Sequence, residues 1–165
     1  MPFLPESIWR RRLASEKAEL DASGESFSAN SDLTQYDFTI RGAGLFLNSD
    51  GSVGKVGSHR VRVSLKREFP YAGGMDVVWL TPIFHPNIRS EDGKVCIHLL
   101  NAWAEGQTVA SLVAGLRQLL ANPNPQDPLN KEAAKFFIEH PDALSASALP
   151  PSQNKLTRPK IVFSS

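Results

Sequence analysis

Two six-residue segments of the chain alternate strictly between apolar and polar side chains, which is the pattern of a strand with one buried face. The segments are residues 36–41 and 61–66, and a shorter, more apolar run covers residues 75–80. In the two alternating segments the apolar positions are Tyr36, Phe38, Ile40, Val61, Val63 and Leu65. Three strands in succession predict an antiparallel meander.

The connection between the first two predicted strands is rich in glycine. Residues 42–57 contain five glycines and show no clear periodicity beyond residues 45–47. Asn48, Asp50 and two serines in the same stretch are typical turn residues. We therefore expect a long or twisted hairpin connection over this segment.

Helical periodicity appears in three other segments. Residues 5–20 predict an amphipathic helix with Trp9, Leu13 and Leu20 on one face. Thr108 can cap a second helix, which Asn122 and Pro123 would end. Its apolar positions form one stripe: Val109, Leu112, Val113, Leu116, Leu119 and Leu120. A third, short helix is predicted over residues 130–140, with inward-facing positions Ala133, Phe136 and Phe137.

These elements predict an α+β fold. Its order is an N-terminal helix, an antiparallel meander, a long irregular loop over residues 82–107, a central helix and a short C-terminal helix. Residues 22–32 are small and polar and predict a loop. We expect one catalytic core over residues 1–145 and a tail over residues 146–165, where prolines interrupt any periodicity.

Composition excludes several classes of protein. A chain of 165 residues that is 41% hydrophobic and 21% charged is typical of one globular domain. A net charge of +1 argues against a nucleic-acid partner. The apolar runs fall short of the roughly 20 residues that span a bilayer, and we see no secretory signal. We therefore expect a cytoplasmic protein with no membrane partner.

The chain contains one cysteine, Cys96, which excludes an internal disulfide and a multi-cysteine metal site. We accordingly expect no metal and no cofactor. Between Val95 and Ile97, the thiol suits a buried structural role. Its neighbourhood favours a reactive role instead, because it follows turn-forming residues 92–94 in an irregular loop and has His98 two positions later.

The motifs around Cys96 resemble the catalytic core of ubiquitin-conjugating enzymes. Residues 84–88 read FHPNI and residues 92–97 read DGKVCI; Trp103 follows, and residues 123–129 read PNPQDPL. Four pieces in order at compatible spacings make the resemblance specific, and it covers about residues 82–136. The continuation LNKEAA from residue 129 is especially similar to the branch that conjugates NEDD-type modifiers.

The resemblance implies a role for each matching residue. Cys96 would accept the C-terminal glycine of a ubiquitin-like modifier from an activating enzyme as a thioester, and pass it to a substrate lysine. Asn87 would stabilise the oxyanion or hold the loop. Asp127 would orient or desolvate the incoming lysine, with closure of the proline turn as the alternative. The remaining matches, which would support the site structurally, are His85, Pro86 and Trp103.

The chain departs from the family pattern at several positions. His98 stands where Asp or Asn is common, and we consider a role in deprotonating the acceptor against a tolerated substitution. One ligase-binding loop would lie near Tyr71 and the other near Glu105, but both lack the usual continuations. The last C-terminal helix of the family is expected to be missing.

The run Arg10, Arg11 and Arg12 is interpreted either as a solvated helix face or as a surface that docks an acidic partner. The activating enzyme would bind through this N-terminal helix.

Two other functions stay open at the level of sequence. The chain could be a catalytically inactive variant of the same fold that positions a partner conjugating enzyme or modifier. It could also be a cysteine hydrolase in which Cys96 works with His85 or His98, although no separate motif would orient such a histidine.

Overall fold

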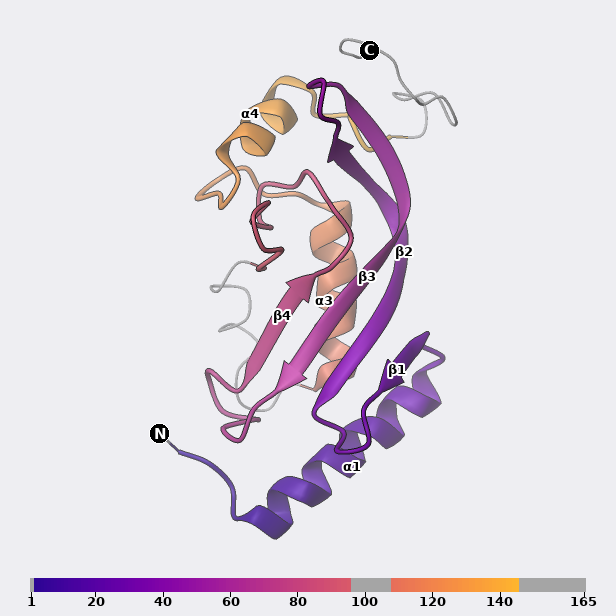
Figure 1. The fold of residues 1–165 in the computed structure, drawn as a ribbon, viewed down its shortest axis with the longest axis vertical. Helices are drawn as coiled ribbons and strands as arrows, with labels where there is room; N and C mark the ends of the chain where they lie inside the picture. Colours follow the sequence, from indigo (N-terminus) through magenta and orange to yellow (C-terminus); the bar gives the residue numbers. More distant parts are fainter. Residues whose placement is uncertain (1, 96–107, 146–165) are drawn as a thin grey trace.

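The computed structural model describes residues 2–95 and 108–145. Within these ranges the elements follow in this order: α1 (Glu6–Ser23), β1 (Phe27–Ala29), β2 (Gln35–Leu47), β3 (Val53–Leu65), β4 (Met75–Trp79), α3 (Val109–Ala121) and α4 (Lys131–Glu139). Figure 1 shows a bent sheet with α3 against one face, α1 and β1 at one end, and α4 at the other. The predicted α+β architecture is confirmed.

The sheet is an antiparallel meander in the order β1-β2-β3-β4. Its register places Tyr36 opposite Val63 and Asp37 opposite Arg62. The alternation therefore works as predicted: the first pair is fully buried, whereas the second lies on the outer face as an ion pair of 2.8 Å between Asp37 Oδ1 and Arg62 Nε. That contact, a hydrogen bond from Arg62, lowers the pKa of Asp37.

The hairpin between β2 and β3 is much longer than predicted. Both strands run for 13 residues, so most of the glycine-rich stretch is strand, and the turn covers only residues 48–52. Expecting a connection over all of residues 42–57 was wrong in extent, because Gly42, Gly44 and Gly54 lie in the strands, where they allow close packing. A Cβ on Gly44 would lie 2.7 Å from the ring of His59, next to a register shift between Arg41 and Gly44. The strands twist strongly there (Figure 1).

Strand β1 lies inside the segment predicted to be a loop. Phe27 pairs with Phe38, and Ala29 pairs with Tyr36. Three residues are too few for a period to be recognised, and it is the pairing with β2 that makes them a strand. The prediction of a loop over residues 22–32 is corrected at this point.

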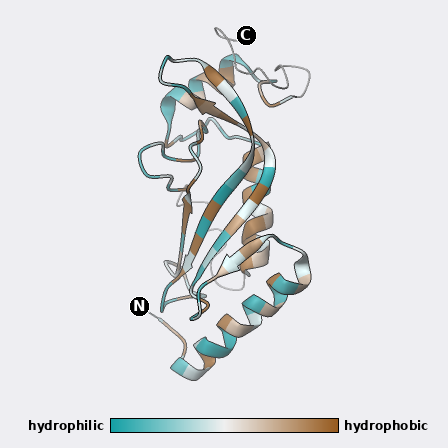
Figure 2. Cartoon of the chain, turned by 45° about the vertical axis from the view of Figure 1, so that its right-hand side comes forward, coloured by the Kyte–Doolittle hydropathy of each residue, from teal (hydrophilic) through white to brown (hydrophobic). Residues whose placement is uncertain are grey.

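Helix α3 supplies the main core, as its stripe predicts. Leu112, Val113 and Leu116 are fully buried against the sheet. Thr108 caps the helix by accepting a hydrogen bond from Ser111 N, and Asn122 ends it. Figure 2 shows the apolar colour concentrated along this helix, whereas α1 is mostly hydrophilic. On α1 the buried apolar residues are the predicted Trp9, Leu13 and Leu20.

A smaller apolar cluster lies under α4. Its core residues are Leu45, Val53, Phe84, Ala133, Phe137 and Ala143. Phe136 packs against this cluster while partly buried, and Asn130 caps the helix through a hydrogen bond from Ala133 N. The cluster joins the ends of β2 and β3 to Phe84, which immediately precedes the predicted site.

No helix in the described ranges is long and apolar enough to cross a bilayer. The same residues hold no group of three or more His, Cys, Asp or Glu side chains that could bind a metal ion. The predicted tail over residues 146–165 and the absence of a last helix lie outside the described residues.

Candidate active site

The candidate site is built on a buried turn at residues 85–88. His85 is 2% exposed and Asn87 is 4% exposed, and Pro86 between them is also buried. The turn is closed by a hydrogen bond of 3.3 Å from Ile88 N to the His85 carbonyl. Phe84 anchors its start in the cluster under α4. A turn with so little exposure can hold its polar groups only by bonding each of them.

Asn87 clamps the backbone of Asn124. Its Nδ2 donates to the Asn124 carbonyl at 2.9 Å, and its Oδ1 accepts from Asn124 N at 2.9 Å. The two bonds span 37 residues of sequence. They fix the start of the proline-rich turn against the site, which is the loop-holding arrangement.

The ring of His85 is bonded to backbone on both nitrogens. Nδ1 accepts from Asn87 N at 3.0 Å, so Nε2 carries the proton and donates to the Leu119 carbonyl at 2.9 Å. Burial lowers the pKa of His85 to about 4. The imidazole is therefore neutral near pH 7, and neither nitrogen is left to deprotonate a thiol.

The proline-rich turn is held to the site from its other end as well. The Pro86 carbonyl accepts from Leu129 N at 2.8 Å and from Asn130 N at 3.1 Å. Between these anchors Asp127 is exposed and adopts a left-handed backbone with φ 56°, a conformation that aspartate tolerates better than most residues. The structure thus presents the Asp127 carboxylate to solvent on a turn fixed at both ends.

The segment that leads to Cys96 is described up to Val95. Val95 is buried and forms a β-bridge with Ile88, the residue after Asn87. Val78 and Lys94 form a second bridge, which ties the segment to β4. The predicted site residues Cys96, His98, Trp103 and Glu105 lie outside the described residues.

The loop between the turn and Val95 is closed by Arg89 and Asp92. Their ion pair is 2.6 Å between Arg89 Nη2 and Asp92 Oδ2, and Asp92 also accepts from Lys94 N at 3.1 Å. The hydrogen bond from Arg89 is the main cause that lowers the pKa of Asp92 to about 2. Gly93 has φ 77° and passes so close to the Trp79 carbonyl that a Cβ there would collide with it.

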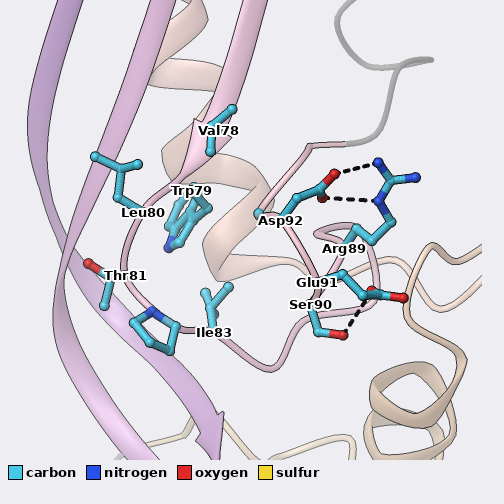
Figure 3. Close-up of a pocket in the computed structure, with 11 residues that line it drawn as sticks. Val78, Trp79, Leu80, Thr81, Ile83, Arg89, Ser90, Glu91 and Asp92 are labelled. Carbon is cyan, nitrogen blue, oxygen red and sulfur yellow. Dashed lines mark hydrogen bonds and ion pairs between the residues drawn. The ribbon is translucent and has the colours of Figure 1, made fainter.

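Two open grooves flank this loop. Figure 3 shows the first, of about 280 Å³, between Trp79 and Ile83 on one side and the Arg89–Asp92 pair on the other. The second, of about 310 Å³, is lined by β4 together with Arg89, Val95 and Leu129. It therefore borders both the approach to Cys96 and the end of the proline-rich turn.

The predicted docking arginines lie along α1, where Arg10 and Arg11 are exposed. Arg10 pairs with Glu6 at 3.0 Å, and Arg12 pairs with Glu16 at 2.7 Å. These are pairs one turn apart on the same helix, and they do not in themselves identify a partner.

Tyr71 is half-buried in a loop over residues 66–74. The loop is closed by bonds from Tyr71 N to the Glu68 carbonyl and from Lys66 N to the Gly74 carbonyl. It joins α1 through Trp9, whose Nε1 donates to the Lys66 carbonyl at 3.3 Å. The structure thus places the predicted docking residues of α1 and the Tyr71 loop next to each other.

Two residues that connect distant segments could not be assigned a role from the sequence. Asn124 receives the Asn87 clamp through its backbone and closes its own turn by accepting a hydrogen bond from Gln126 N at 3.0 Å. The Asn-Pro signal indicates a turn but not the partner across the fold. Glu16 accepts from Val109 N at 2.7 Å across 93 residues, and no pattern on α1 could have indicated that contact.

Comparison with known proteins finds similarity to enzymes that conjugate ubiquitin or NEDD8. A family model described as ubiquitin-conjugating enzyme matches residues 12–148. A ubiquitin-conjugating enzyme E2 S of Branchiostoma floridae is 31% identical over 123 residues, which is 74% of this chain and 54% of that protein. The NEDD8-conjugating enzyme UBC12 of Saccharomyces cerevisiae is 47% identical over 64 residues, 38% of this chain and 34% of that protein. The chain spans about half the length of the curated relatives it matches.

Solved structures agree. The structure of S. cerevisiae Ubc12 is 29% identical and covers 84% of this chain and 74% of its own, with a TM-score of 0.62. The E2 domain of a Toxoplasma gondii ubiquitin conjugating enzyme is 26% identical and covers 81% of this chain and 89% of its own, with a TM-score of 0.63. The predicted similarity to NEDD-type enzymes is confirmed by the Ubc12 matches in sequence and structure.

Proposed function

Since the chain belongs to the ubiquitin-conjugating enzyme family, whose model matches residues 12–148, we propose that it conjugates a ubiquitin-like modifier to target proteins through a thioester on Cys96. The observation that carries the proposal is the position of Val95. The residue directly before the chain's single cysteine is buried against Ile88, next to the Asn87 clamp. Cys96 follows Val95 directly in the sequence, so its thiol would act beside the turn at residues 85–88.

The proposed reaction has two acyl transfers. The Cys96 thiolate attacks the carbonyl of the modifier's C-terminal glycine, and the thiolate of the activating enzyme leaves. A neutral lysine amine then attacks the new thioester, an amide forms, the Cys96 thiolate leaves and the amine's extra proton goes to solvent. Each step passes through a tetrahedral oxyanion, which a positioned donor stabilises.

Asn87 can serve that oxyanion while it holds the turn. An amide nitrogen carries two hydrogens, and the contact with the Asn124 carbonyl uses one of them. We propose that the second hydrogen is directed to the oxyanion. Holding the loop and stabilising the oxyanion were alternatives at the level of sequence. In this proposal Asn87 does both, with one amide hydrogen for each. Loss of such a donor typically costs about 10²- to 10³-fold in rate.

Asp127 is proposed to receive the acceptor lysine. Its exposed carboxylate is carried on a turn with both ends bonded to the Asn87 and Pro86 region. His98 is proposed to assist deprotonation of the acceptor, because an imidazole titrates near neutral pH. The modifier's C-terminal peptide would lie in the groove between β4, Val95 and Leu129.

The partners follow from the same family. We propose that the activating enzyme docks on α1 around Arg10, Arg11 and Arg12, and that a ligase, where one is used, docks near Tyr71 and Glu105. The cytoplasm is the proposed location. The bonding of both His85 nitrogens to backbone argues against a cysteine hydrolase that uses His85 as its base.

The test is a charging reaction on the full chain. The protein is mixed with an activating enzyme, ATP and candidate modifiers, including a NEDD-type one, and resolved on a non-reducing gel. We expect an adduct that thiol reductant removes. Cys96→Ser should convert it to a reductant-resistant ester, and Cys96→Ala should abolish it.

The alternative is the inactive variant that positions a partner. It would be supported if no cognate pair charges Cys96 while the protein still binds a modifier or another conjugating enzyme in a pull-down with purified components. A reducible adduct excludes this alternative.

A further inference from the structure

Among the described residues, Glu16 on α1 is the one buried carboxylate, with its side chain 3% exposed. A buried charge is costly unless both of its oxygens are bonded. The catalytic proposal gives Glu16 no role. Its bonding partners indicate what it does.

The two oxygens of Glu16 face different parts of the molecule. Oε1 accepts from Val109 N at 2.7 Å, and Oε2 accepts from Arg12 Nε at 2.7 Å. Val109 is the first residue of α3, where a negative charge is favourable because the free N–H groups of the helix point toward it. In the chain, α3 follows the segment that contains Cys96.

Arg12 continues the contact toward the surface. Its guanidinium lies 5.1 Å from the centre of the Phe69 ring, in the loop that carries Tyr71, and its side chain is 25% exposed. Arg12, Glu16 and Val109 thus form a line from the proposed docking surface to the start of α3. We call the two hydrogen bonds that Glu16 accepts, from Val109 N and from Arg12 Nε, the Glu16 link.

We propose that Glu16 is a positioning residue which couples Arg12 on the docking surface to the start of α3, so that a partner engaging Arg12 alters the reactivity of Cys96. The coupling to reactivity rests on the proposed function. A partner that draws Arg12 away removes the cation beside a buried carboxylate. Glu16 must then rely on its remaining donors, and the position of Val109 changes with it.

Tyr36 is a second buried polar group, and the charge of Glu16 acts on it. Its ring is fully buried, and its hydroxyl has no hydrogen-bond partner among the described residues. Burial, then the negative charge of Glu16, raise the pKa of Tyr36 to about 12, so the hydroxyl keeps its proton. A buried hydroxyl without an acceptor is available to bond a carboxylate that comes within reach.

The first test needs no partner. Hydrogen exchange at the Val109 amide is measured in the full chain for the parent protein, Glu16→Ala, Glu16→Gln and Arg117→Gln. We expect Glu16→Ala to accelerate exchange about 10- to 100-fold. Glu16→Gln should accelerate it less, because its oxygen still accepts from Val109. Arg117→Gln is the matched control, because Arg117 also pairs α3 with a carboxylate, Glu25 just after α1, but eight residues beyond Val109.

The second test measures charging of Cys96 against activating-enzyme concentration. Arg12→Ala should raise KM and also lower the maximal rate about 5-fold or more. Arg12→Lys, which keeps a cation beside Glu16, should restore part of the maximal rate. Thr108→Ala removes the local cap of α3 and controls for simple fraying of that helix; Arg117→Gln should leave both parameters within about twofold of the parent values.

Each outcome decides one point. Unchanged Val109 exchange in Glu16→Ala overturns the link. An effect of Arg12→Ala on KM alone, or a fall in maximal rate in Thr108→Ala that equals the fall in Arg12→Ala, overturns the coupling. If the parent protein never charges, the proposed function fails, while the exchange experiment still tests the link.

Discussion

The buried turn at residues 85–88 and the first half of α1 both depend on polar contacts, but they use them in opposite ways. At the turn, His85 and Asn87 bond to the backbone of residues 34 and 37 positions away, and both side chains are almost inaccessible to water. On α1, Arg10 pairs with Glu6 four residues away, with both side chains more than half exposed. Buried contacts of the first kind define geometry, whereas exposed pairs of the second kind leave a surface free to meet a partner.

The largest effect is expected on the unfolding free energy when His85, on the buried side of this comparison, is replaced. His85→Ala leaves Leu119 O and Asn87 N unpaired in a buried site and creates a cavity, and we expect a loss of about 3 to 5 kcal/mol in unfolding free energy. Urea denaturation measures it. His140→Ala is the matched control, because His140 is exposed; a comparable loss in both variants would contradict the contrast.

Asn87 comes next. Asn87→Ala removes both bonds to Asn124, and we expect a loss of about 2 to 3 kcal/mol in unfolding free energy. Asn122→Ala, which removes an exposed amide bonded only to Gln118, should cost well under half as much. If the two variants are equally stable, the clamp does not hold the proline-rich turn.

The turn should also make the protein sensitive to acid. The folded state holds the pKa of His85 at about 4, whereas the unfolded chain has an ordinary value near 6.5. The unfolded state therefore binds more protons between these values, so stability is complete above pH 6.5 and falls as the pH drops toward 4. From pH 7 to 5 this site alone should cost about 2 kcal/mol.

Denaturation at several pH values tests this dependence. His59 is buried as well and its pKa is lowered by that burial, so it acts in the same direction. Stability that is flat between pH 5 and 7 would contradict a neutral, doubly bonded His85.

The smallest expected effect sharpens the other side of the comparison. Arg10→Ala breaks an exposed pair and should change unfolding free energy by less than about 0.5 kcal/mol. If α1 docks the activating enzyme, the same variant should still raise the KM for charging. A large loss of stability would show that this end of α1 is structural rather than a docking surface.

Much of this fold was predictable because its elements carry strong local patterns. The stripe of α3 and the alternation of residues 36–41 and 61–66 each repeat often enough to indicate a period. Strand β1 has three residues, and the glycines of β2 and β3 resemble a turn because their packing partners, such as His59, are distant in sequence. Local signals fail where a residue's conformation is determined by its neighbour in space.

The same division holds at the site. The sequence by itself determined the motif residues and their order around a single cysteine. These motifs were enough to indicate the family to which the chain belongs. Only the tertiary structure decided that Asn87 binds the backbone of Asn124, that both His85 nitrogens bond to backbone, and that Glu16 bonds to Val109. The physical reason is that a buried polar group must find a partner, and which partner it finds depends on how the chain has brought distant segments together.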